Sequence, residues 1–119
     1  MPRFSQLLIA GLAAIAATGL QAECTYPEEV LIPDGAASTY EEMRDSQTYV
    51  KEYMAGMETY LECLEQEESS LANELTNENE LTDEGKLLHT QRRHEAIDAM
   101  ESVAARFNEQ VRVYKKVNP

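Results

Sequence analysis

The sequence predicts an all-α fold: two long helices in an antiparallel hairpin, with an extended N-terminal arm pinned to the first helix by one disulfide. Three observations lead to this prediction. Two long segments repeat apolar residues at alternating steps of three and four, the pattern of helices that pack on helices. A short polar stretch separates these segments. One of the only two cysteines falls in a proline-containing arm and the other in the first helical segment.

Residues 1–22 have the pattern of a secretory signal peptide. Arg3 supplies the positive start, residues 7–17 form a short apolar run, and the small residues before Glu23 suit cleavage after Ala22. We therefore expect a periplasmic or secreted protein with no membrane span in the mature chain.

Two alternatives concern the same leader. Residues 4–20 carry no charge and approach the roughly 20 residues that cross a bilayer, so an uncleaved anchor is the competing interpretation. Lipidation of Cys24 is not expected, because Glu23 occupies the position where a lipoprotein needs a small residue.

Residues 23–38 are predicted to form an extended arm, which precedes a helical hairpin over residues 39–119. Pro27 and Pro33 disfavour a helix, and Asp34 followed by Gly35 is a turn signal. The arm also carries apolar side chains that need a surface to cover them: Tyr26, Val30, Leu31 and Ile32.

The first helix is expected over about residues 40–76, and Thr39 with Glu42 forms a capping box at its start. Two interleaved heptad lines make its seam: Met43, Val50, Met57, Leu64 and Leu71 with Gln47, Met54, Leu61, Glu68 and Leu75. A second flank holds Gly56 and Cys63 on one line, with Tyr53 and Tyr60 beside them. We expect the arm to lie on this flank, because glycine permits a close approach.

A Cys24–Cys63 disulfide is compatible with the chain lengths. Cys63 lies roughly 36 Å along the helix from Thr39, whereas the arm from Cys24 to Ser38 can extend to about 50 Å. The bond would close a loop whose chain-entropy stabilisation is near 4 kcal/mol as an upper figure. Intermolecular pairing and free thiols are the alternatives.

The second helix is expected over about residues 83–117. Thr82 is a suitable N-cap, Asp83 and Glu84 are acidic residues in the first turn, and Lys115 and Lys116 suit the last turn. Its seam is predicted as Ile97, Met100, Ala104, Phe107, Val111 and Tyr114, with Leu87 and Leu88 lying off it.

The charge pattern bears on partners. Removal of the leader with Arg3 changes the formal net charge from −12 to −13, which makes nucleic acid and anionic membranes poor partners. Residues 23–84 hold 18 acidic residues against two basic ones, whereas residues 85–119 hold four acidic residues against seven basic ones. Antiparallel helices would therefore attract each other along their flanks, although solvated faces are the simpler interpretation.

Three segments resemble an uncharacterised family of small exported, periplasmic helical proteins of Gram-negative bacteria. They are the Tyr-Pro and Ile-Pro-Asp-Gly elements of residues 26–35, the run from Tyr53 to Leu64, and the run from Met100 to Arg112. The resemblance covers most of the mature chain. It implies a shared all-helical architecture in which Cys24 and Cys63 are fixed positions. It implies no activity, cofactor or catalytic residue.

No arrangement in the sequence predicts catalysis, a cofactor or a metal site. His89 and His94 are five residues apart, which turns them away from each other on a helix. The stretch 77–82 lacks the ligand and glycine positions of a calcium loop, because Leu81 and Thr82 occupy them. No serine or cysteine arrangement suits a nucleophile.

Three sets of side chains have both a binding and a structural interpretation. Core packing is favoured for the methionines Met43, Met54, Met57 and Met100, and packing of the arm is favoured for the tyrosines Tyr26, Tyr40, Tyr49, Tyr53, Tyr60 and Tyr114. A solvated helix face is favoured for Glu58, Glu62, Glu65 and Glu68.

Two functions remain as expectations. The first is a protein-interaction or structural module that binds a protein partner, or a second copy of itself, through the helix seams, since two helices and an arm leave part of each apolar stripe uncovered. The alternative is an acidic protein that binds cations or a small ligand on the glutamate-rich face of the first helix.

Overall fold

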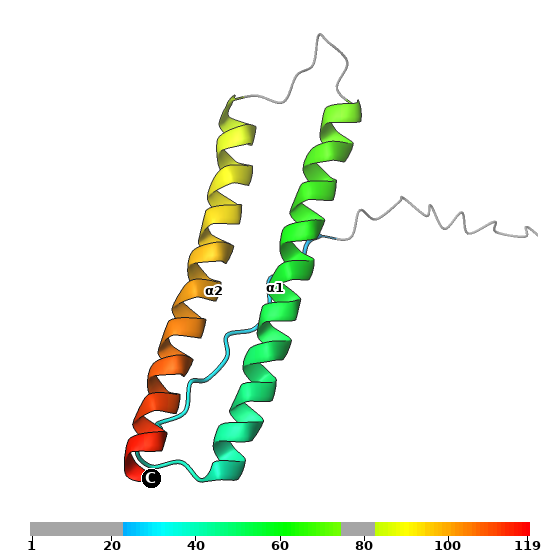
Figure 1. Ribbon diagram of the computed structural model, residues 1–119. Helices are drawn as coiled ribbons and strands as arrows, with labels where there is room; N and C mark the ends of the chain where they lie inside the picture. The colour runs from blue at the N-terminus through cyan, green and yellow to red at the C-terminus, as the bar shows by residue number, and fades with distance from the viewer. Residues whose placement is uncertain (1–22, 75–82) are drawn as a thin grey trace, which may run out of the picture.

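Two helices of equal length form an antiparallel hairpin in the computed structural model, which describes residues 23–74 and 83–119 (Figure 1). Helix α1 spans Tyr40–Glu74 and helix α2 spans Asp83–Val117, each with 35 residues. The described residues contain no strand. The predicted all-α hairpin is confirmed. Four predictions concern residues 1–22 and 75–82, which lie outside the described part: the leader, the last residues of the first helix, the absence of a calcium loop at 77–82 and the N-cap at Thr82.

The start of α1 and both bounds of α2 lie where the sequence predicts them. The Glu42 N–H donates to Thr39 Oγ1 at 3.1 Å, and the Thr39 N–H donates to Glu42 Oε2 at 3.1 Å, so the capping box is confirmed. Helix α2 has acidic residues in its first turn and Lys115 and Lys116 in its last turn. These charges oppose the partial charges of the helix ends.

The core lies between the helices. Met43, Val50, Met57 and Leu64 of α1 are all buried, which confirms four of the five residues of the first predicted heptad line, whereas Leu71 is half-buried. Met57 is fully buried, and Leu64 is 1% exposed. The second line flanks the core, since Met54 and Leu61 are partly buried and pack against it.

The predicted seam of α2 is partly wrong. Ile97 is 41% exposed, whereas its neighbour Ala96 is fully buried and lies on one line with His89 and Val103. Phe107 is buried as predicted, and Met100, Val111 and Tyr114 pack at the edge of the core. The physical reason is space, because a small side chain at the line of closest approach lets two helices come together. A prediction that follows only the large apolar residues therefore places the seam beside the line of closest contact and not on it.

Replacing Ala96 with leucine is expected to lower the free energy of unfolding by about 1–3 kcal/mol, because three extra carbons have no space at a fully buried position. Ala105 is exposed on the same helix and supplies the matched control. Ala105→Leu should stay within about 0.5 kcal/mol of the wild type. Urea unfolding followed by circular dichroism measures both, and equal effects would contradict the observed register.

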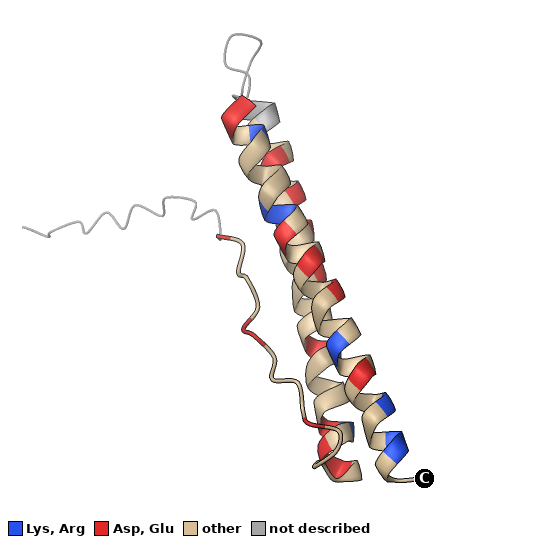
Figure 2. Ribbon diagram, turned by 90° about the vertical axis from the view of Figure 1, so that its left-hand side faces the viewer, with Lys and Arg blue, Asp and Glu red and all other residues tan. Residues whose placement is uncertain are grey.

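The arm covers one face of the hairpin only. Figure 2 shows it on one side of the paired helices, and in Figure 1 it runs behind them. Cys24, Val30 and Ile32 of the arm are partly buried against the core. The molecule therefore has a covered face and an uncovered face.

Two ion pairs connect the acidic first helix to adjacent arginines of the second helix. Arg92 lies 3.4 Å from Glu67, and Arg93 lies 2.8 Å from Glu68, both measured from Nη1 to a carboxylate oxygen. All four side chains are about one-third exposed, so each pair contributes only a few tenths of a kcal/mol. The predicted attraction between the acidic and basic halves is present at these two pairs.

Candidate functional site

The arm is attached at its upper end by the predicted disulfide. Cys24 and Cys63 are bonded, with their Cα atoms 5.6 Å apart, and no free cysteine is present in the chain. Glu67 Oε2 lies 3.4 Å from Cys24 Sγ. Because that sulfur carries no proton in a disulfide, this is a packing contact and not a hydrogen bond.

Tyrosines fill the space below the disulfide. The rings of Tyr26 and Tyr60 meet edge to face, with centroids 5.1 Å apart. Burial raises the pKa of Tyr53, and the neighbouring Tyr26 and Glu29 raise it further. A hydrogen bond with Tyr60 raises the pKa of Arg92. The arm-packing interpretation is therefore confirmed for Tyr26, Tyr53 and Tyr60, which join the arm to both helices.

Glycine allows the arm to approach α1, as predicted. A Cβ at Gly56 would lie 3.1 Å from Cγ of Pro27. The predicted flank of Gly56, Cys63, Tyr53 and Tyr60 is thus the surface on which the upper arm lies.

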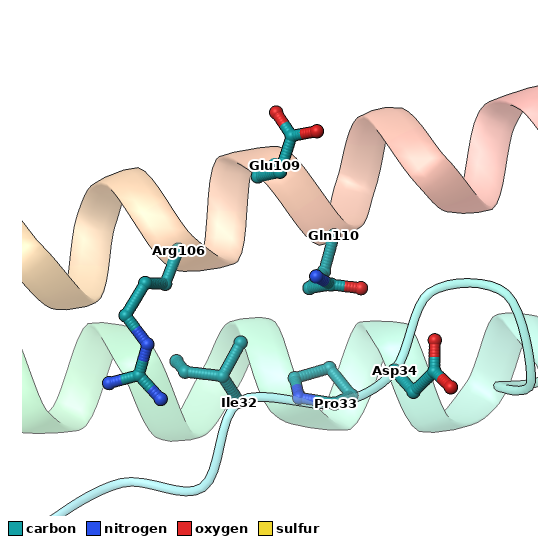
Figure 3. A pocket seen from close by; sticks show the side chains of 6 residues that line it. All are labelled: Ile32, Pro33, Asp34, Arg106, Glu109 and Gln110. Atoms are coloured by element: carbon teal, nitrogen blue, oxygen red, sulfur yellow. The ribbon is translucent and has the colours of Figure 1, made fainter.

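The lower end of the arm is attached to α2, which the sequence pattern did not predict. The Gly35 N–H donates to Gln110 Oε1 at 2.8 Å. Figure 3 shows this region, where Gln110 and Arg106 extend from α2 toward the arm. A shallow pocket here is lined by Ile32, Pro33, Asp34, Arg106, Glu109 and Gln110.

The turn at Asp34 holds Gly35 in this place. The Ala36 N–H donates to Asp34 Oδ1 at 3.0 Å, and the Ala37 N–H donates to the Asp34 carbonyl oxygen at 3.1 Å. The Ser38 hydroxyl donates to the same carbonyl at 2.6 Å. The Asp-Gly dipeptide signalled the turn, but nothing local in the sequence signalled its contact with Gln110.

The uncovered face carries an apolar strip. The arm lies against the Tyr53 and Gly56 flank of α1 and the Gln110 flank of α2, so the opposite flanks have no cover within the described part of the chain. Helical spacing places six side chains there: Met54, Leu61, Ile97, Met100, Ala104 and Val111. Ile97 is the most exposed of the large side chains in this strip, at 41%.

A groove continues the strip toward the lower end of the hairpin. It is lined by residues of both helices: Tyr40, Met43, Arg44, Gln47, Phe107, Val111, Tyr114 and Lys115. No residue of the arm lines it. The groove and the six-residue strip form one continuous surface, which we call the uncovered face.

The remaining predicted candidates are separated. Met43 and Met57 are buried and Met54 and Met100 pack on the core, as the core interpretation expects. His89 is buried, with no hydrogen-bond partner for Nδ1 within the described residues, whereas His94 is exposed. Tyr40 and Tyr49 are exposed, and Tyr114 packs on the core.

The glutamate row is mostly solvated. Glu58, Glu62 and Glu65 are exposed, and Glu68 bonds Arg93. Across residues 23–74 and 83–119, no three His, Cys, Asp or Glu side chains are grouped so as to hold a metal ion. Within the same ranges, neither helix is long and apolar enough to cross a membrane.

These features define a disulfide-linked helical hairpin with one face covered by its own arm and the other face open. No family model, curated protein or solved structure matches the chain.

Proposed function

We propose that this chain is an exported, acidic helical protein that acts as a protein-interaction module through the uncovered face. One observation carries the proposal: the apolar strip lies on the face that the arm leaves open, and Ile97 is its most exposed large side chain. A partner helix laid along this strip would complete a bundle around the existing core.

Export is supported by the leader pattern, by the resemblance to exported Gram-negative proteins and by the disulfide. Disulfides persist mainly in oxidising compartments such as the periplasm and the extracellular space. The mature chain is expected to begin at Glu23 and to reside in one of these compartments. The strong negative charge supports a protein partner over nucleic acid or an anionic membrane.

Site-specific crosslinking in intact cells tests the interaction. A photoreactive phenylalanine analogue at Ile97 lies on the uncovered face, and the same analogue at Leu31, which is 89% exposed on the arm, is the matched control. We expect a discrete covalent adduct from position 97 and none from position 31. The absence of adducts from position 97, or identical adducts from both positions, would contradict the proposal.

A further inference from the structure

The uncovered face is bordered on α1 by four charged residues spaced seven apart, Arg44, Lys51, Glu58 and Glu65, which we call the charged line. All four are exposed, and Arg44 lines the groove at the lower end. Arg44 and Lys51 are the only basic residues of α1. The line therefore has a basic half and an acidic half of equal length.

This order is self-complementary in one orientation only. If two α1 helices lie antiparallel, Arg44 of one copy faces Glu65 of the other, and Lys51 faces Glu58. The two-fold axis then falls between Met54 and Ala55. In a parallel alignment of the two α1 helices, like charges would meet at every position. Flanking charges of this kind set orientation in helical assemblies.

The second helix fits the same axis. Glu67 pairs with Arg92 and Glu68 with Arg93, so residues whose numbers add to about 160 lie at one height along the hairpin. The axis therefore passes at the height of residues 105–106, and Ala104 is the nearest residue of the strip. Its small side chain allows two α2 helices to come close, and Met100 of one copy lies at the height of Val111 of the other.

The competing two-fold arrangement places α1 of one copy over α2 of the other. The border of α2 carries Glu101, Asn108 and Lys115 at the same spacing of seven, all exposed. At matching heights, Arg44 would then face Lys115 and Glu58 would face Glu101. Both pairs are repulsive, so the charges disfavour this arrangement.

We infer that the occupant of the uncovered face is a second copy of this chain, packed with α1 against α1 in antiparallel orientation about an axis near Met54. The inference rests on the proposed function, because it uses the same face. The apolar strip supplies the buried surface, and the charged line selects orientation and partner. The product is a four-helix bundle with the two arms on its outer sides.

Charge reversal with complementation tests the inference. The variant R44E/K51E makes the line wholly acidic, and E58K/E65K makes it wholly basic. Each variant alone should weaken self-association roughly tenfold or more, since four attractive pairs become repulsive. An equimolar mixture should form a heterodimer at least as tight as the wild-type dimer. Sedimentation velocity in low salt, at micromolar and submicromolar protein, measures all three.

The matched control is R112E/K116E, which reverses two exposed basic residues on the outer side of α2. It should dimerise like the wild type, and circular dichroism should show all variants to be helical. A strictly monomeric wild type, or reversed variants that do not recover on mixing, would overturn the inference. If the wild type is monomeric but position 97 still crosslinks a different protein, the proposed function stands and the homodimer fails. If position 97 also yields no adduct, both fail.

Discussion

Replacing both Cys24 and Cys63 with alanine is expected to lower the free energy of unfolding by about 2–4 kcal/mol. The bond joins residues 39 apart in sequence, so its loss releases a long loop in the unfolded chain. The arm also loses the covalent bond at its upper end, where the tyrosine contacts and the contact of Pro27 with Gly56 then remain. The lower attachment at Gly35 should persist, because it depends on α2.

Urea unfolding and hydrogen exchange check this result together. We expect faster exchange in the upper arm near Val30 and unchanged exchange at Gly35. Addition of a reductant should destabilise the wild type and leave the double variant unaffected, which serves as the control. Equal stability of the two proteins would show that the disulfide does not hold the arm.

Gly35→Ala is expected to cost about 2–4 kcal/mol, because a buried side chain has no space there. A Cβ at this position would overlap the Gln110 carbonyl oxygen and lie 2.9 Å from the Tyr114 backbone nitrogen. Both atoms belong to the backbone of α2, so neither can rotate away. The arm must move outward, which also breaks the hydrogen bond from the Gly35 N–H to Gln110.

Gly56→Ala is the matched control for the second glycine contact. Its Cβ would meet Cγ of Pro27, which belongs to the mobile edge of a ring, at 3.1 Å. Alanine is also the better helix former by about 1 kcal/mol. The stability of Gly56→Ala should therefore stay close to that of the wild type. A loss at position 56 as large as that at position 35 would contradict this account of the two contacts.

Much of the fold could be predicted because its signals are local or depend on length. The capping box needs only Thr39 and Glu42, and the antiparallel hairpin needs only two apolar repeats with a short connection. The reach of the arm and the rise of the helix made the disulfide possible, and the structure selects it over intermolecular pairing and free thiols. Each argument uses the geometry of one segment, which the residue order already contains.

The errors and omissions arose where two segments meet. Ile97 was predicted to lie in the seam because it is large and apolar, yet Ala96 occupies the contact because the helices approach closely there. The docking of Gly35 on Gln110 joins residues 75 apart in sequence. The spacing of apolar residues in the arm or in α2 does not predict a contact between these two segments.

The uncovered face combines both kinds of information. Arg44, Lys51, Glu58 and Glu65 can be read from the sequence as a line on one helix. Whether that line borders an open surface depends on which flank of the hairpin the arm covers. The heptad pattern alone does not distinguish the two flanks, but Gly56 and Cys63 predict the covered flank of α1. The contacts of Gly56 with Pro27 and of Gly35 with Gln110 decide it.

By itself, the sequence determined the helices, their caps, the cysteine pair and the charge asymmetry, because these follow from spacing along one chain. Only the tertiary structure decided the register of α2 and the docking of the lower end of the arm on that helix. Both depend on the distance between separate segments, which is set by the size of the side chains that meet and is not encoded in any one repeat.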